Sequence, residues 1–169
     1  ASLPSLVAAL ENGDTPTVAR FTEDLVALSA SRRVYDQLRW IDETGIELVR
    51  VDYVQNQPFV VPDDRLQNKS QRYYFIATMR LERGGIYVSP LDLNIEQDRI
   101  ETPYKPVIRL GMPVQDKFGN PRGIIMVNFF GSYLLEKFSE VTESKDGDVR
   151  VSLRNRDGYW LRAPQTVDE

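Results

Sequence analysis

The chain has 169 residues, of which 41% are hydrophobic and 27% charged, and its formal net charge is -4 at pH 7. This composition is typical of a globular protein, and without a basic stripe it argues against nucleic-acid binding. The sequence contains no histidine and no cysteine, the residues most often used as general bases, thiolate nucleophiles and zinc ligands. The catalytic options that remain are mostly paired carboxylates, lysine or a carboxylate-bound divalent metal. We expect that this chain is not an enzyme and has no cofactor and no metal site.

Two helices are predicted near the N-terminus, over residues 5–11 and 16–30. Pro16 favours a helix start, because proline is tolerated in the first turn. The apolar residues of the second helix recur at steps of three and four and form one stripe: Val18, Phe21, Leu25 and Leu28. This stripe must be buried, either by a sheet of the same chain or by a neighbouring subunit.

The stretch YDQLRWIDETGIELVRVDY (35–53) predicts a β-hairpin that turns at Glu43-Thr44-Gly45. Apolar side chains alternate onto both faces, which predicts a sheet covered on both sides. Arg39 and Arg50 are interpreted as sheet-surface residues whose aliphatic stems cover apolar neighbours.

The segment 66–81 is predicted to be a helix, because Asn68 and Gln71 have the spacing of a capping box. A short strand is expected over 84–89. Residues 90–105 show no clean period, and a loop of this length in a compact domain is usually functional, so we interpret it as a lid. The segment contains several acidic residues, but it lacks the glycine and the terminal glutamate of an EF-hand, so we do not interpret it as a calcium site.

Two further strands (106–114 and 124–130) and a helix (131–141) complete the main pattern, which predicts an α+β fold with a five-stranded antiparallel sheet. Asn128 interrupts an apolar strand, and its buried amide must be hydrogen-bonded, either to a ligand or to backbone groups, of which we favour the backbone. A last hairpin is predicted over 149–164. The longest apolar run, 123–135, is too short to span a bilayer, so any membrane-spanning segments are expected outside this chain.

Five stretches in this order resemble the extracytoplasmic Cache (PDC, PAS-like) sensor domains of bacterial histidine kinases and diguanylate cyclases: YDQLRWIDETGIELVRV, LQNKSQRYYF, YVSPLDLNIE, KPVIRLGMPVQDKFGNPRGIIMVNFFG and NRDGYWLRAP. The resemblance implies a PAS-like sheet with the N-terminal helices on one face and a helix and loop on the ligand side. It implies a membrane-distal module over 1–143, then a linker and the first hairpin of a truncated membrane-proximal module over 144–169. It also implies a periplasmic part of an inner-membrane receptor that is a homodimer when intact.

The same resemblance implies ligand-binding residues. In amino-acid-binding Cache domains, an Arg-x-Trp-Tyr pattern grips the ligand carboxylate and a later aspartate binds the amine. The corresponding stretch here is RYYF, which gives Arg72, Tyr74 and Phe75, with tyrosine in place of tryptophan and phenylalanine in place of tyrosine. Asp92 falls where the aspartate is expected. The alternative is that Arg72 is a solvated helix residue and Tyr74 a core residue.

Arg109 is a candidate from the strand pattern itself. It faces the same way as Gly111, whose missing side chain would leave room for an anion beside the guanidinium. The alternative is an ion pair between Arg109 and an acidic residue of the 90–105 loop.

The sequence thus predicts a non-catalytic sensory module that binds a small molecule between the 70–80 helix, the 90–105 loop and the sheet face with Arg109. Two arginines facing one aspartate favour a ligand that bears a carboxylate. Two other functions stay open. One is a ligand-free interaction module that dimerises through residues 5–30. The other is a carboxylate-dependent hydrolase, which needs two close acids in a cleft.

Overall fold

A computed structural model describes residues 4–96, 99–143, 153–154 and 160–162. The chain divides into two compact units, Ala1–Ser89 with Arg109–Phe129 and Pro90–Ile108 with Phe130–Glu169. The helices are α1 (Pro4–Asn12), α2 (Thr15–Arg32), α3 (Tyr73–Met79) and α4 (Gly131–Glu143). The strands are β1 (Tyr35–Ile41), β2 (Glu47–Val54), β3 (Gln57–Val60), β4 (Tyr87–Val88), β5 (Asp92–Leu93), β6 (Ile95–Glu96), β7 (Arg99–Ile100), β8 (Pro106–Gln115), β9 (Pro121–Phe130), β10 (Leu153–Arg154) and β11 (Trp160–Arg162).

Seven strands of the described residues form the main sheet, in the order β3-β2-β1-β9-β8-β4, with β5 paired to β8. β1 is central and pairs antiparallel with both β2 and β9, so the predicted hairpin forms the middle of the sheet. The five predicted strands are all present. The prediction missed β5 and also β3, which follows β2 through a two-residue turn at Gln55 and Asn56, both with positive φ.

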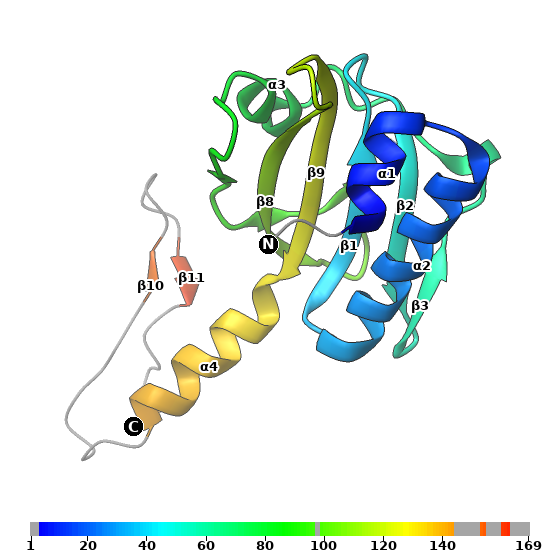
Figure 1. Cartoon of the computed structure of the whole chain (residues 1–169). Helices are drawn as coiled ribbons and strands as arrows, with labels where there is room; N and C mark the ends of the chain where they lie inside the picture. The colour runs from blue at the N-terminus through cyan, green and yellow to red at the C-terminus, as the bar shows by residue number, and fades with distance from the viewer. Residues whose placement is uncertain (1–3, 97–98, 144–152, 155–159, 163–169) are drawn as a thin grey trace, which may run out of the picture. The chain divides into compact units, whose positions relative to one another are not determined.

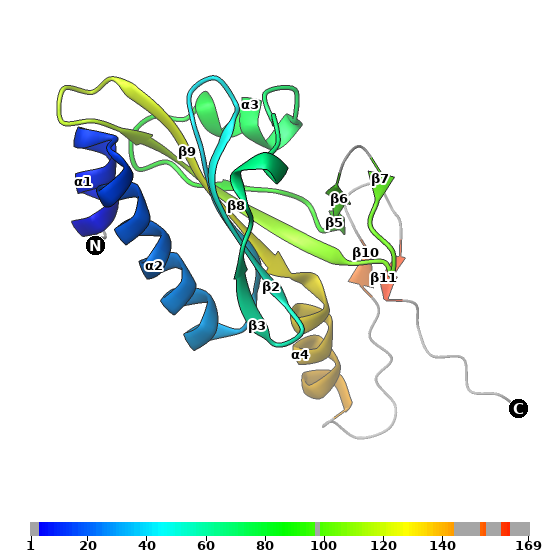
Figure 2. The ribbon, with the colours of Figure 1, turned by 90° about the vertical axis from the view of Figure 1, so that its right-hand side faces the viewer.

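The two N-terminal helices cover one face of the sheet, as Figures 1 and 2 show. Phe21 and Leu25 are 0% and 2% exposed, and they pack against Leu38, Trp40 and other residues of β1 and β2. The apolar stripe of α2 is therefore buried within the chain itself. Asp14 caps α2 by accepting a hydrogen bond from the Thr17 backbone N–H at 3.1 Å.

The opposite face of the sheet carries α3 (Figure 2). A second apolar cluster lies there, formed by Ile41, Tyr74, Phe75, Ile124 and Met126. Gly111 of β8 allows this close packing, because a Cβ at this position would collide with the side chain of Thr78 and would lie 2.7 Å from Met126 Cε. The predicted room beside Arg109 is thus filled by protein atoms at Gly111, and that part of the interpretation was wrong.

The α3 helix begins seven residues later than predicted. Residues before it bind the hairpin instead: the Glu47 N–H donates to the Gln67 carbonyl at 3.0 Å, and the Lys69 N–H donates to the Gly45 carbonyl at 2.6 Å. Asn68 does not cap a helix, since its side-chain oxygen accepts the Ser70 N–H at 2.8 Å in a local turn.

The second unit contains the predicted 90–105 loop, which is more regular than expected because β6 and β7 pair as a small hairpin. Asn94 is 1% exposed and organises this segment: its side-chain amide donates to Glu101 at 2.9 Å and to Glu96 at 3.3 Å. Helix α4 also belongs to this unit. β10 and β11 form the predicted last hairpin, whose turn lies outside the described residues.

Candidate ligand-binding site

Two buried arginines lie against one tyrosine ring in the first unit. Arg39 on β1 and Arg109 on β8 are each 1% exposed, and their guanidinium carbons are 5.5 and 5.2 Å from the centre of the Tyr74 ring. Arg72, directly before α3, lies 5.9 Å from the same ring. Cations within about 6 Å of an aromatic face are attracted to its π electrons, so Tyr74 helps to hold three positive charges together.

Arg39 is fixed by a buried polar network. Its Nη2 donates to the side-chain oxygen of Asn128 at 2.6 Å, and its Nη1 lies 3.3 Å from the Tyr74 hydroxyl and 3.5 Å from Glu47 Oε1. Asn128 in turn donates to the side chain of Gln37 at 2.9 Å. The prediction that Arg39 is a surface residue was therefore wrong. Asn128 thus binds the side chains of Arg39 and Gln37, two partners that the prediction did not include.

Glu47 extends this network toward β2. It is 1% exposed, lies 3.8 Å from Arg50 Nη1, and accepts the Gln67 N–H at 3.0 Å. Arg50 is 6% exposed and forms a two-bond pair with Asp52, at 2.7 and 3.0 Å. Arg50 was also predicted to be a surface residue, which was wrong for the same reason: each buried charge has a charged partner that the strand pattern did not reveal.

Arg109 is held at the sheet end near β4. Its backbone N–H donates to the Ser89 hydroxyl at 2.8 Å, and its Nη1 donates to the Tyr73 hydroxyl at 3.2 Å. Tyr73 is 43% exposed and packs edge-on against Tyr74, with ring centres 5.5 Å apart. A cation is therefore held between the sheet and a tyrosine whose ring reaches the surface.

The sequence-predicted residues divide into three groups. Arg72, Tyr74 and Arg109 are brought together around the Tyr74 ring. Phe75 is 7% exposed and packs in the apolar cluster under α3. Asp92 belongs to the second unit, where it pairs with Val107 of β8, and its part in a ligand site stays a prediction.

Sequence reasoning missed Arg39, Tyr73 and Asn128. The signal for Arg39 and Asn128 was present, because each is a polar residue within an apolar strand, and a buried polar group needs a partner. What the sequence lacked was the pairing, since Arg39 and Asn128 lie 89 residues apart and meet only when β1 pairs with β9.

A cluster of guanidinium groups and tyrosine hydroxyls supplies hydrogen-bond donors and positive charge, which suit the binding of an anion. In the described part of the chain, no group of three or more Asp, Glu, His or Cys side chains is arranged to hold a metal ion. Within the same residues, no helix is both long and apolar enough to cross a membrane.

Three solved structures share the fold. The extracellular domain of vpHK1S-Z8, assigned as a histidine kinase, has a TM-score of 0.79 and 20% identity over 96% of this chain and 57% of its own. A domain of a sensory box/GGDEF family protein from Vibrio parahaemolyticus has the same TM-score and identity, over 96% of this chain and 60% of that domain's chain. The ligand-binding domain of the Pseudomonas aeruginosa amino acid chemoreceptor PctC, in complex with GABA, has a TM-score of 0.52 and 13% identity over 82% and 53%.

This chain thus spans 57% and 60% of the first two structures. No curated protein matches the sequence. A family model described as the sensor domain of bacterial histidine kinases matches residues 6–168. Because this match covers nearly the whole chain, and because the α+β fold with α3 opposite the N-terminal helices agrees with it, the chain belongs to the bacterial histidine kinase sensor domain family.

Proposed function

We propose that the sensory role of this domain depends on binding a small anionic molecule, through a carboxylate, at the arginine cluster around Tyr74. The observation that carries this proposal is the burial of Arg39 and Arg109, each 1% exposed, against one ring. Burying an arginine is costly because its charge leaves water, so a cluster of buried arginines points to a role beyond packing. A cluster that serves packing alone could use apolar residues of similar volume at no loss of stability.

The chemistry of the cluster sets the class of ligand. Glu47 is the carboxylate that ion-pairs with Arg39, and it is shared with Arg50. Arg72 and Arg109 add positive charge beside Tyr73, whose exposed ring gives the site a border at the surface. A ligand carboxylate would accept two parallel hydrogen bonds from a guanidinium, which gives direction as well as energy. PctC, which shares the fold, is bound to GABA, a molecule that carries a carboxylate.

The proposal includes the context of the domain. We infer that the chain is the periplasmic part of an inner-membrane histidine kinase or diguanylate cyclase, that it is not itself catalytic, and that membrane segments lie elsewhere in the receptor. The division into a module over 1–143 and a second one from 144 belongs to the same proposal, as does a homodimer in the intact receptor. A ligand would act by binding one conformation more tightly than the other, since only differential affinity shifts such an equilibrium.

A thermal-shift screen tests the proposal directly. The purified domain is heated with organic acids, with amino acids and with the methyl esters of the same acids, which keep the size but lose the charge. A ligand at one hundred times its Kd stabilises the folded state by about 2.7 kcal/mol. We expect stabilisation by a subset of the acids and none by their esters. Equal stabilisation by the acids and their esters would contradict the proposal, and so would the absence of stabilisation by either.

A further inference from the structure

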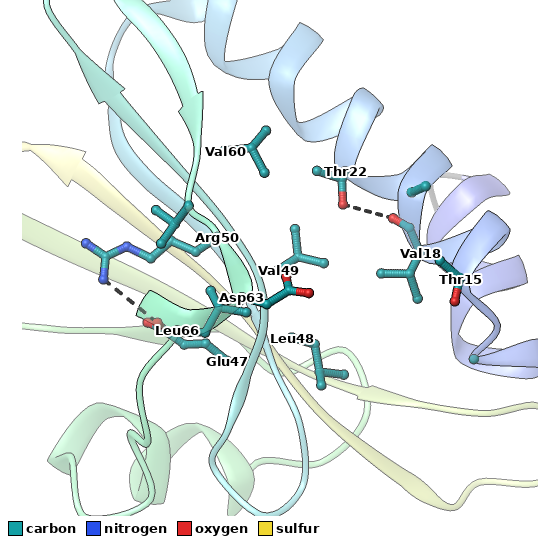
Figure 3. Close-up of a pocket in the computed structure, with 13 residues that line it drawn as sticks. Thr15, Val18, Thr22, Glu47, Leu48, Val49, Arg50, Val60, Asp63 and Leu66 are labelled. Atoms are coloured by element: carbon teal, nitrogen blue, oxygen red, sulfur yellow. Dashed lines mark hydrogen bonds and ion pairs between the residues drawn. The ribbon is translucent and has the colours of Figure 1, made fainter.

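A cavity of about 430 Å³ lies on the other face of the sheet, between α2 and the strands β2 and β3. This volume is within the range of about 300–1,000 Å³ that is typical of small-molecule sites. Its walls include Val18 and Ala19 of α2 together with Val49, Val60 and Val61. Figure 3 shows Val18 on the helix side of the cavity and Val49 and Val60 on the strand side. None of the three guanidinium groups of the arginine cluster belongs to the cavity lining, whereas Glu47, which pairs with Arg39, does.

The charged residues that line the cavity differ in where they point. Glu47 and Arg50 turn away from α2 toward each other, whereas the Asp63 carboxylate points toward α2 (Figure 3). Arg50 is further neutralised by its pair with Asp52 at 2.7 Å. Asp63 is exposed, and within the described chain its side chain makes no hydrogen bond or ion pair. The cavity therefore presents one uncompensated negative charge beside apolar walls.

The N-terminal end of α2 also borders the cavity, at Gly13 and Thr15, and a helix N-terminus favours anions. This end is already occupied, because the Asp14 carboxylate accepts the Thr17 N–H at 3.1 Å. Its negative charge offsets the helix dipole. The balance of charge around the cavity thus remains negative.

We propose that this cavity is a second ligand site, and that it binds an organic ammonium ion with an apolar body. The ammonium group lies at Asp63, and the apolar part lies between Val18 of α2 and Val49 of β2. Such a ligand differs in charge from the one proposed at the arginine cluster. It would also contact α2 together with β2 and β3, the elements that line the cavity.

Amide NMR spectra of the domain, recorded while 2-phenylethylamine is added, test this proposal. The neutral and anionic analogues are 2-phenylethanol and 3-phenylpropionate. We expect the amine to shift the amide signals of Val18, Val49 and Val61 saturably, with an affinity higher than that of the alcohol. The carboxylate should leave these three signals unchanged.

Two variants and one control complete the experiment. Asp63→Asn should weaken amine binding about two- to fivefold, the range for exposed ion pairs, whereas Asp64→Asn, at the neighbouring exposed acid outside the cavity lining, should not. Ala19→Phe, at an exposed helix position, should fill the cavity and abolish the shifts. The proposal is overturned if no saturable shift occurs at these residues, if amine and alcohol bind equally well, or if either variant binds like the wild type.

Discussion

The first prediction concerns Glu47, the buried carboxylate between Arg39 and Arg50. Glu47→Gln keeps the size of the side chain but removes its charge, so two arginines that are 1% and 6% exposed lose an ion-pair partner. Breaking a buried ion pair by neutralising one partner typically costs about 3–5 kcal/mol. We expect the lower end, about 3 kcal/mol, because Arg50 keeps its pair with Asp52.

For a chain of this length, each kcal/mol corresponds to about 2–4 °C in Tm, so the expected loss is about 6–12 °C. Thermal and urea unfolding followed by circular dichroism measure this change. Glu43→Gln is the matched control, since Glu43 is an exposed acid in the turn of the same hairpin. In Arg39→Met/Glu47→Gln, where both charges are removed, part of the loss should be recovered. A Glu47→Gln variant as stable as the control would refute the interpretation of this network as a set of interdependent buried charges.

Three further predictions follow from the packing, from the pH dependence and from the C-terminal hairpin. Gly111→Ala should lower the free energy of unfolding, measured in urea, by about 1–3 kcal/mol, the range for overpacking, because the new Cβ meets Thr78 and Met126. Adding Thr78→Ala to this variant should reduce the loss. An unchanged urea midpoint for Gly111→Ala would contradict the close contact. The side chain of Asn120, and also the backbone N–H groups of Asn120 and Phe118, hold the pKa of Asp116 below its ordinary value of 3.8. The ionised Asp116 carboxylate therefore stabilises the folded state above the unfolded pKa, and this stabilisation is lost as the pH falls through the folded pKa. Asp116→Ala should flatten the fall in unfolding free energy below about pH 4. A pH profile of stability that is the same in the variant and the wild type would argue against this contribution of Asp116. Deleting residues 145–169 should leave Tm nearly unchanged, because two strands alone cannot bury a core, and a large fall would show that the hairpin belongs to the main domain.

Five of the seven strands of the main sheet were predicted, several of them because apolar side chains alternate between two faces. In β1, Leu38 and Trp40 pack under the N-terminal helices while Ile41 packs under α3. The family could also be recognised, because its motifs occur in order along one chain. The α3 start was not predictable from Asn68, since the backbone groups of Gln67 and Lys69 bind the hairpin at Glu47 and Gly45. Local capping signals cannot reveal such tertiary hydrogen bonds.

The candidate site was only partly predictable. Arg72, Tyr74 and Arg109 were found through a family motif and a strand pattern, and they do lie around one ring. Arg39 was wrongly assigned to the surface, because the sequence of a single strand does not show which side chains of neighbouring strands pair with it. Its partner Asn128 is adjacent only through the β1–β9 register. Polar residues inside apolar strands should therefore be tested against each other before they are assigned to solvent.

The central claim is that the arginine cluster binds the anionic group of a ligand, and calorimetry on Arg72→Ala tests it most directly. Arg72 lies at the start of α3, and Arg80 at its end is an exposed arginine that serves as the matched control. With the acid that the thermal-shift screen identifies, Arg72→Ala should lose about 2 kcal/mol of binding energy or more, which is about thirtyfold in Kd, while Arg80→Ala should bind as the wild type does. A folded Arg72→Ala variant that binds this acid with unchanged affinity would contradict the claim.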